Sequence, residues 1–238
     1  MNKKIVVMGL VLLLLGTAMG LGQYQMTFHI PDFPPYTYLE SGVLKGIAIE
    51  MVSAVLEKVG ISYNLVLVPN FGRALEDLIQ SASDGFFLAS QNAARDKVAV
   101  FSRAVTLNNW SWFVLADSDL NPKSPDFIKE ARTGSMINTN THTWLTDNGY
   151  QVSGTPTDAN TLIRMLKANR INSIFLSEAV FYEAVDLAGE PRNAYKSTVQ
   201  IATPFGIYIA KAYLDKNPSV MSQINEAILA LYGDVKPE

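Results

Sequence analysis

The sequence of 238 residues contains no cysteine and only two histidines. Without cysteine, the chain needs no disulfide bond to fold and offers no thiol for a thioether-linked lipid. His29 and His142 are far apart in sequence and have no cysteine beside them, so we expect each to be structural or solvent-facing, with no metal site. The sequence also has no P-loop, no dinucleotide-binding glycine fingerprint and no G-x-S-x-G elbow, so no motif suggests a bound cofactor or a catalytic group.

Long apolar runs are scarce, and the one near the start of the chain covers residues 5–15. It is shorter than the roughly 20 residues that a membrane-spanning helix needs, and no charged stop follows it. Two lysines precede the run and several small residues follow it, which is typical of a signal peptide. We therefore expect residues 1–22 to be a signal peptide cleaved after Gly20 or Gly22, with a membrane anchor as the alternative.

Basic residues are fewer than acidic ones, 19 against 22 in the whole sequence. Removing residues 1–22 leaves 17 basic residues against 22 acidic ones, a net charge of about −5, which argues against a nucleic-acid-binding surface. The apolar fraction of 48% is ample for a core, and the length suits one large or two modest domains. These features predict an exported protein, without a lipid anchor, in the periplasm.

The first third of the chain alternates strands and helices. We expect strands at residues 26–30, 61–68 and 86–89, a helix between Gly46 and Gly60, and a helix at 73–82 with Leu75, Leu78 and Ile79 facing inward. The segment PDFPPYTYLESG between the first strand and the first helix contains three prolines and predicts an irregular loop. This order of elements predicts a parallel sheet with right-handed crossovers.

Polar residues follow the strand at 86–89 abruptly. Asn92 is a good N-cap for the next segment, so helical N–H groups, the Ser90 hydroxyl and the Arg95 guanidinium could face one point. Arginine presents a planar fork of donors that matches a carboxylate. Taken alone, however, Arg95 could equally be a solvated helix residue beside Asp96 and Lys97.

Aromatic residues point to the same place. Parallel sheets bind ligands beyond the carboxyl ends of their strands, and Phe33, Phe71, Ser90 and Arg95 all follow such ends. Aromatic residues on the loop after the first strand could be ligand platforms or a lid on the core. The agreement of four positions favours a ligand site.

The second half repeats the alternation. We expect a strand within NNWSWFVLADSDL, strands at 133–137, 151–153, 171–176, 198–201 and 205–210, and helices near Trp144, at 158–170 and at the carboxyl end. Ser177 and Glu178 again follow a strand end. Two similar αβ lobes, each with polar residues past its strands, suggest a cleft between them.

Four stretches carry a family resemblance: PPYTYLESGVLKGIAIEMVSAVLEKVG, NFGRALEDLIQSASDGFFLASQNAARDKVAVFS, ANRINSIFLSEA and FGIYIAK. In this order and spacing they resemble the type 2 periplasmic solute-binding proteins, in particular family 3, whose members serve polar amino-acid ABC importers. The resemblance implies an α/β fold of two lobes, each a mixed, mostly parallel sheet flanked by helices. It implies a first lobe from residues 23–108 and 203–238, a second from 109–202, and hinge crossings near 105–110 and 198–203.

The resemblance also implies roles for individual residues. The arginine matching Arg95 clamps the ligand carboxylate with help from the serine matching Ser90, and aromatic residues matching Phe33 and Phe71 sandwich the ligand. A turn in the second lobe adds donors to the same carboxylate; here it runs from Asn138 to Thr141, and Asn138, Thr139 and Asn140 are its candidate ligand-binding residues.

This sequence departs from the family pattern at three positions. Ser177 replaces an aspartate that usually neutralises the ligand ammonium, and Ile30 and Asn138 replace an acid and a glycine. Glu178 could substitute for the missing acid, although neighbouring residues at a strand end point in different directions. The carboxylate partner is therefore better supported than any ammonium partner.

The predicted function is that of a monomeric binding protein that captures a small carboxylate or amino-acid-like ligand by hinge closure, for import through an ABC permease. It would need no catalytic residue, metal or cofactor. Two alternatives stay open. One is a dehydratase-like enzyme of the same fold, for which Glu178 is the candidate acid–base group. The other is a solute sensor that is not coupled to transport.

Overall fold

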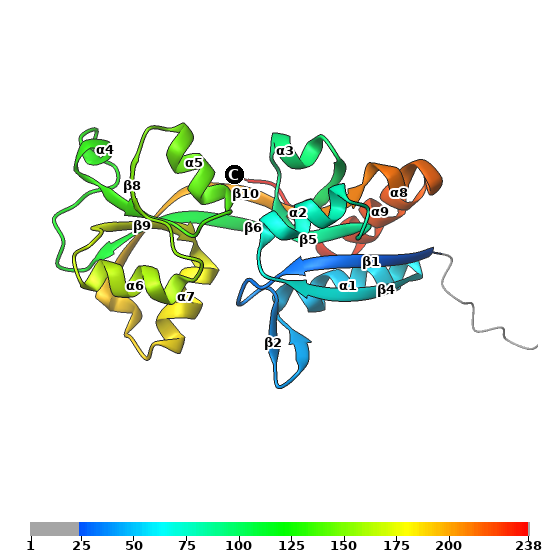
Figure 1. The fold of residues 1–238 in the computed structure, drawn as a ribbon, viewed down its shortest axis with the longest axis horizontal. Coiled ribbons are helices and arrows are strands. Elements are labelled where there is room, and N and C mark those ends of the chain that lie inside the picture. The colour runs from blue at the N-terminus through cyan, green and yellow to red at the C-terminus, as the bar shows by residue number, and fades with distance from the viewer. Residues whose placement is uncertain (1–23, 238) are drawn as a thin grey trace, which may run out of the picture.

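A computed structural model describes residues 24–237, so the predicted signal peptide at residues 1–22 lies outside the described part. Eight strands of the described residues form one sheet in the order β4-β1-β5-β10-β6-β9-β7-β8. One group of helices packs around each end of this sheet, so the molecule has two halves (Figure 1). Among residues 24–237, no helix has the length and apolarity needed to span a membrane.

The first half contains the parallel strands β1, β4 and β5, flanked by five helices. Strand β5 is buried at every residue, which is typical of a strand covered on both faces. The helices and main strands of the first half are β1 (Tyr24–Pro31), α1 (Ile47–Val59), β4 (Ile61–Val68), α2 (Phe71–Ile79), β5 (Gly85–Ser90), α3 (Ala93–Asp96), α8 (Lys211–Lys216) and α9 (Val220–Tyr232).

Helix α1 lies between the two glycines that the sequence indicated. Gly60 has a left-handed backbone (φ 78°), which glycine adopts without steric cost, and its N–H donates to the carbonyl oxygen of Glu57. The predicted ends of this helix are confirmed.

Helix α2 differs from the prediction in the face it buries. Ile79 is 58% exposed, whereas Asp77 is 2% exposed. The Asp77 carboxylate pairs with His29 Nδ1 at 2.7 Å and with Arg73 Nε at 2.8 Å. These partners allow a charged side chain to occupy the inward position, so the prediction for Ile79 is wrong, while Leu78 is buried as predicted.

The segment predicted as an irregular loop is only partly irregular. After the prolines, β2 (Tyr38–Glu40) and β3 (Val43–Lys45) pair as a short antiparallel hairpin that projects from the first half (Figure 1). Two-residue turns between short strands close hairpins readily, and Gly42 supplies a positive φ of 79° there.

The second half contains β7, β8 and β9, which pair in parallel, and four helices. Helix α7, directly after β9, was not predicted. A cluster that includes Trp112, Phe127 and Phe175 packs one side of this half. The elements of the second half are α4 (Phe127–Glu130), β7 (Arg132–Gly134), α5 (Asn140–Asp147), β8 (Gln151–Gly154), α6 (Ala159–Lys167), β9 (Ser173–Ser177), α7 (Glu178–Leu187) and the 3₁₀ turn η1 (Arg192–Ala194).

Two long strands join the halves. β6 (Ala99–Leu115) and β10 (Tyr195–Ala210) pair antiparallel from Tyr195 opposite Leu115 to Ala210 opposite Ala99. β10 is continuous where the sequence predicted two separate strands: Pro204 lies within it, opposite Leu107, and the register shifts at other positions. Because β6 and β10 pair antiparallel at the centre, the sheet is mixed. The predicted boundaries between the two lobes, near residues 108 and 203, stay a prediction.

Candidate functional site

A cavity of about 20 Å³ lies where the two halves meet, and seven of the nine predicted site residues line it. This volume holds about one water molecule. The lining residues are Phe33, Phe71, Ser90, Arg95, Asn108, Trp110, Thr139, Asn140, Thr141, Leu176, Ser177 and Phe205. We call this space the inner cavity. Asn138 lies in a neighbouring cleft instead, and Glu178 lines neither space.

Arg95 carries the formal charge of the inner cavity. The side chain of Asn92 caps α3 by accepting a hydrogen bond from the Arg95 N–H at 2.9 Å, which fixes the start of the turn. The Arg95 residue is only 4% exposed, and its Nη1 donates to the carbonyl oxygen of Ser90 at 2.6 Å. The guanidinium lies 4.8 Å from the ring centroid of Phe71 and 5.6 Å from that of Phe86. Arg95 is therefore not the solvated helix residue that the sequence left as an alternative.

The electrostatics of Arg95 are unusual. Burial lowers the pKa of its guanidinium to about 10, which still leaves the group protonated at neutral pH. Among the ion pairs formed by the described residues, none involves Arg95. A buried cation is normally paired with an anion, because taking a charge out of water is costly.

The start of α3 contributes less than the sequence suggested. The N–H of Asn92 donates to the hydroxyl of Tyr208 at 3.2 Å, so it is not directed at a ligand. The helix has only four residues. The donors available to a ligand on this side are those of Arg95 and the hydroxyl of Ser90, which lies 3.0 Å from the Thr203 hydroxyl.

The second half contributes the turn before α5. Asn138 has a left-handed backbone (φ 61°), a conformation that asparagine tolerates better than most residues, which explains how it can replace glycine. The side chain of Thr139 caps α5 by accepting a hydrogen bond from the N–H of His142 at 3.3 Å.

Asn140 connects the two halves directly. Its Nδ2 donates to the carbonyl oxygen of Ser90 at 3.1 Å, and its Oδ1 accepts a hydrogen bond from Asn92 Nδ2 at 2.7 Å. Ser90 ends β5 and Asn92 follows it in the first half, whereas Asn140 begins α5 in the second. The side chain of Asn140 thus links the two halves directly.

The opposite wall of the inner cavity is neutral. Ser177 Oγ donates to Asn108 Oδ1 at 2.7 Å, and Ser177 pairs with Trp110 across β9 and β6. Glu178 accepts a hydrogen bond from Asn109 Nδ2 at 3.2 Å and does not reach the cavity. Burial raises the pKa of the nearby Tyr36 hydroxyl, although its hydrogen bond with Ser177 acts in the opposite direction. None of the described residues that line this cavity is an aspartate or a glutamate.

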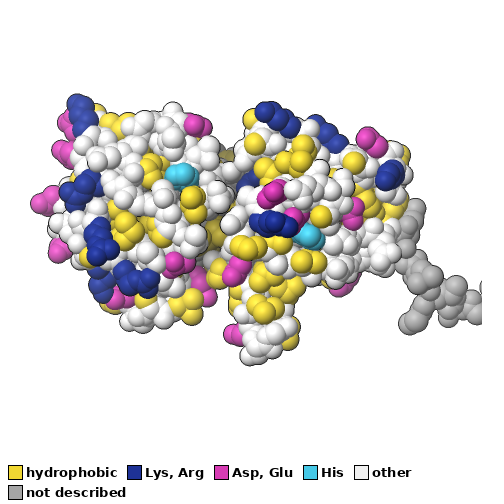
Figure 2. Space-filling view, viewed as in Figure 1, with side chains coloured by type: hydrophobic (Ala, Val, Ile, Leu, Met, Phe, Trp, Pro, Cys, Tyr) yellow, Lys and Arg dark blue, Asp and Glu magenta, His cyan; other side chains and the backbone are white. Residues whose placement is uncertain are grey.

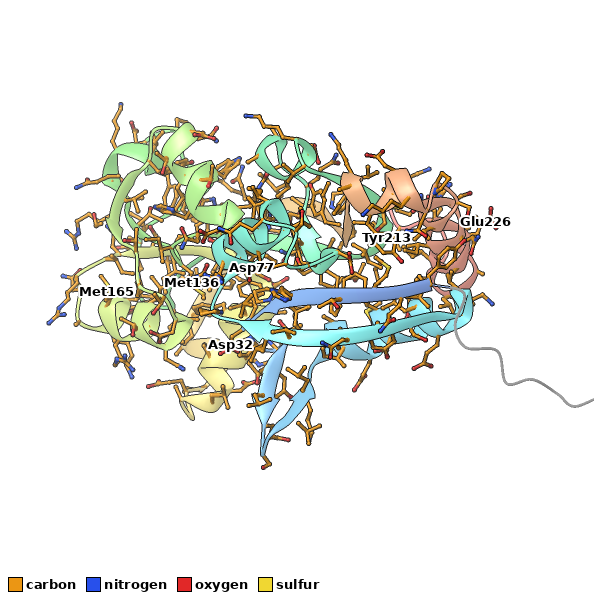
Figure 3. The ribbon with its side chains drawn as sticks, turned by 45° about the vertical axis from the view of Figure 1, so that its right-hand side comes forward. Asp32, Asp77, Met136, Met165, Tyr213 and Glu226 are labelled. Carbon is orange, nitrogen blue, oxygen red and sulfur yellow. The ribbon has the colours of Figure 1, made fainter. Side chains whose placement is uncertain are left out.

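A larger cleft of about 510 Å³ adjoins the inner cavity and shares Phe33, Phe71 and Thr139 with it. We call this space the outer cleft. The rings of Phe33 and Phe71 lie edge to face with centroids 5.3 Å apart, and they separate the two spaces. Figure 2 shows the surface hollowed between the two halves, and Figure 3 labels Asp32 and Met136, which line the outer cleft from opposite halves.

The outer cleft has apolar walls and acidic side chains. Met136, Val180 and Leu187 are among its apolar residues, and Asp32, Asp158 and Glu183 are its acids; the described lining includes no lysine or arginine. Burial raises the pKa of Asp32. The Asp158 carboxylate also caps α6 by accepting a hydrogen bond from the N–H of Thr161 at 2.8 Å.

Several lining residues were missed in the sequence. Asn108, Trp110 and Phe205 lie within long strands rather than past strand ends, so the rule used to find site residues could not select them. The predicted crossings near residues 105–110 and 198–203 were the available signal, since crossing strands must border a space between lobes. Thr141 belongs to the predicted turn at residues 138–141, although it was not selected as a site residue, and Leu176 had only its neighbour Ser177 as a signal.

Comparison with known proteins agrees with this architecture. The family model for bacterial extracellular solute-binding proteins, family 3, matches residues 27–236. No curated protein sequence matches the chain significantly.

Solved structures share the fold at low sequence identity. A substrate-binding protein of an ABC uptake transporter from Streptococcus pneumoniae, with bound histidine, is 18% identical, with 88% of this chain and 87% of that chain covered and a TM-score of 0.73. An ancestral arginine-binding protein bound to arginine is 20% identical, with 90% and 94% covered and a TM-score of 0.70. A histidine kinase sensor domain with similarity to periplasmic binding proteins is 15% identical, with 89% and 98% covered and a TM-score of 0.73. The predicted two-lobed α/β fold is confirmed.

Proposed function

The chain belongs to the bacterial extracellular solute-binding proteins of family 3, and we propose that it captures a small carboxylate or amino-acid-like solute between its lobes for ABC-type import. One observation carries the proposal: Arg95 is a buried guanidinium that forms no ion pair with any described residue, on the wall of a cavity between the two halves. A bound carboxylate would supply the missing anion.

The chemistry of the surrounding groups supports a carboxylate in particular. The guanidinium fork matches two carboxylate oxygens at once, and each hydrogen bond to a charged group contributes about 1.5–3 kcal/mol. The nearby hydroxyl of Ser90 and the amide of Asn140 add neutral donors without adding charge. The rings of Phe33 and Phe71 offer apolar contact to the remainder of the solute.

Entry of a solute requires the halves to separate. The inner cavity of about 20 Å³ is too small for a carboxylic acid, and the rings of Phe33 and Phe71 close its outer side. The Asn140 hydrogen bonds to the first half would break on opening and form again on closure. Binding therefore combines capture at Arg95 with hinge closure.

The test is calorimetric titration with the solute identified by mass spectrometry of purified protein. In Arg95→Met, two charged hydrogen bonds are lost, so we expect affinity to fall at least about 100-fold while the melting temperature stays within a few degrees of wild type. Arg95→Lys keeps the charge but loses the fork, and we expect an intermediate loss. The matched control is Arg192→Met, because Arg192 is an exposed arginine that is paired with Asp186 and lines neither cavity. Unchanged affinity in Arg95→Met would remove the proposed role.

Solute sensing without import is a second candidate, and the fold shared with a histidine kinase sensor domain is the observation in its favour. Uptake of labelled solute by cells with and without the gene separates the two. Import predicts loss of uptake in the deletion strain. Sensing predicts unchanged uptake together with a lost transcriptional response to the solute.

The geometry gives less support to a dehydratase-like enzyme. Glu178, the candidate acid–base group, is hydrogen bonded to Asn109 and lies outside the lining of the inner cavity. Incubation with prephenate, arogenate and the identified solute should return each compound unchanged.

A further inference from the structure

We propose that the preferred ligand is a carboxylate whose positive charge lies at the far end of an apolar stem, an ω-amino or ω-guanidino acid, and that an α-ammonium group is disfavoured. The inference rests on the proposed function, since it assumes a carboxylate at Arg95. It follows from how charge is distributed along the two adjoining spaces. The inner cavity has one cation and no acid, and the outer cleft has three acids and no base among its described lining residues.

The inner end disfavours an α-ammonium group. Such a group would lie one carbon away from the carboxylate held by Arg95, inside a closed space without an acidic side chain. Ser177 and Asn108 face this space, but they are neutral and are hydrogen bonded to each other. An ammonium there would lose its hydration, gain no anionic partner other than the ligand's own carboxylate, and be repelled by the Arg95 guanidinium.

The middle of the path is apolar. Phe33 and Phe71 line both spaces, so a ligand that reaches from one to the other lies against these two rings. Met136, from the second half, lines the outer side of the same passage. A chain of methylene groups suits this section because it buries apolar surface and requires no hydrogen bonds.

The outer end is suited to a cation. Asp32 and Glu183 form no ion pair among the described residues, and Asp158 uses its carboxylate to cap α6. Asp32 and Glu183 are therefore the acids that could stabilise an amino or guanidino group. They come from different halves of the molecule, so a cation between them would also favour the closed arrangement.

The experiment compares matched pairs by calorimetry: 5-aminovalerate with ornithine, 6-aminohexanoate with lysine, and 5-guanidinovalerate with arginine. We expect the member without the α-amino group to bind at least about 10-fold more tightly in each pair that binds. Pentanoate and hexanoate test the distal charge, and we expect them to bind several-fold more weakly than their ω-amino counterparts.

Variants test separately the outer cleft, which should hold the distal charge, and the inner cavity, which should hold the carboxylate. Asp32→Asn combined with Glu183→Gln should weaken the ω-amino acids several-fold and leave hexanoate unchanged. Glu226→Gln is the control, because Glu226 is an acid on α9 at the far end of the first half (Figure 3). Ser177→Asp should strengthen the binding of lysine or arginine at least about 10-fold, since it places an acid beside the α-carbon.

The outcomes separate this inference from the proposed function. α-Amino acids that bind as tightly as their partners, or hexanoate that binds as tightly as 6-aminohexanoate, would overturn the inference and leave a carboxylate site that depends on Arg95. A copurified carboxylate with an α-ammonium group would do the same. If no member of the panel binds and Arg95→Met does not affect the copurified solute, the proposed function itself fails.

Discussion

Asn140→Ala should shift the protein towards an open form even without ligand. The substitution removes both hydrogen bonds that the Asn140 side chain makes to the first half, one to the Ser90 carbonyl and one from Asn92 Nδ2. Each such bond contributes about 0.5–1.5 kcal/mol net, so the closed form should lose about 1–3 kcal/mol. That loss lowers the ratio of closed to open molecules by about 5-fold to 150-fold.

Small-angle X-ray scattering measures this shift as a larger radius of gyration of the unliganded variant, which should return to the wild-type value at saturating ligand. Asn92→Ala removes one of the two bonds from the other side, and we expect about half the effect in free energy. Asn148→Ala is the matched control, because Asn148 ends the same helix and donates only to the Trp144 carbonyl oxygen within it. A radius of gyration of Asn140→Ala equal to that of wild type would refute the reasoning.

Two further predictions concern stability. Burial alone would raise the pKa of Asp77, but the hydrogen bonds from His29 and Arg73 outweigh it and lower the pKa, so the carboxylate stabilises the fold above about pH 4 and loses this effect as the pH falls further. Asp77→Asn should therefore cost about 2 kcal/mol at pH 7, seen as a melting temperature lower by roughly 4–8 °C, and distinctly less at pH 3; an equal cost at both pH values would contradict the assignment. Gly85→Ala would place a Cβ atom 2.4 Å from the carbonyl oxygen of Tyr208, so chemical denaturation should show a loss of about 3 kcal/mol, and a loss under about 0.5 kcal/mol would contradict the close packing.

Local patterns predicted much of the fold. The strand expected at residues 61–68 has those bounds in the structure, and Gly60 and Asp158 end and begin helices as expected. In these cases the deciding interactions lie within a few residues of the signal. Asp77 was different: its inward position depends on His29, which lies 48 residues earlier, and no local pattern records that pairing.

Residues from both halves of the site were predictable, whereas the residues inside strands were not. The rule that ligands bind past the ends of parallel strands selected Phe33, Phe71 and Arg95, which do line the inner cavity. It could not select Trp110 or Phe205, because both lie in strands that continue from one half to the other. The acids of the outer cleft come from separate surface segments, and only the folded chain brings them together.

The long antiparallel pairing between β6 and β10 also limits how the molecule can move. A ribbon of two hydrogen-bonded strands bends easily across its flat face, whereas sliding one strand along the other would break several hydrogen bonds at once. Rotation about a single axis through the ribbon is therefore the easy motion, and contacts on the cleft side are lost and regained together. On the proposed function, such coupling would make capture close to an all-or-none event and would let a permease recognise occupancy from shape alone.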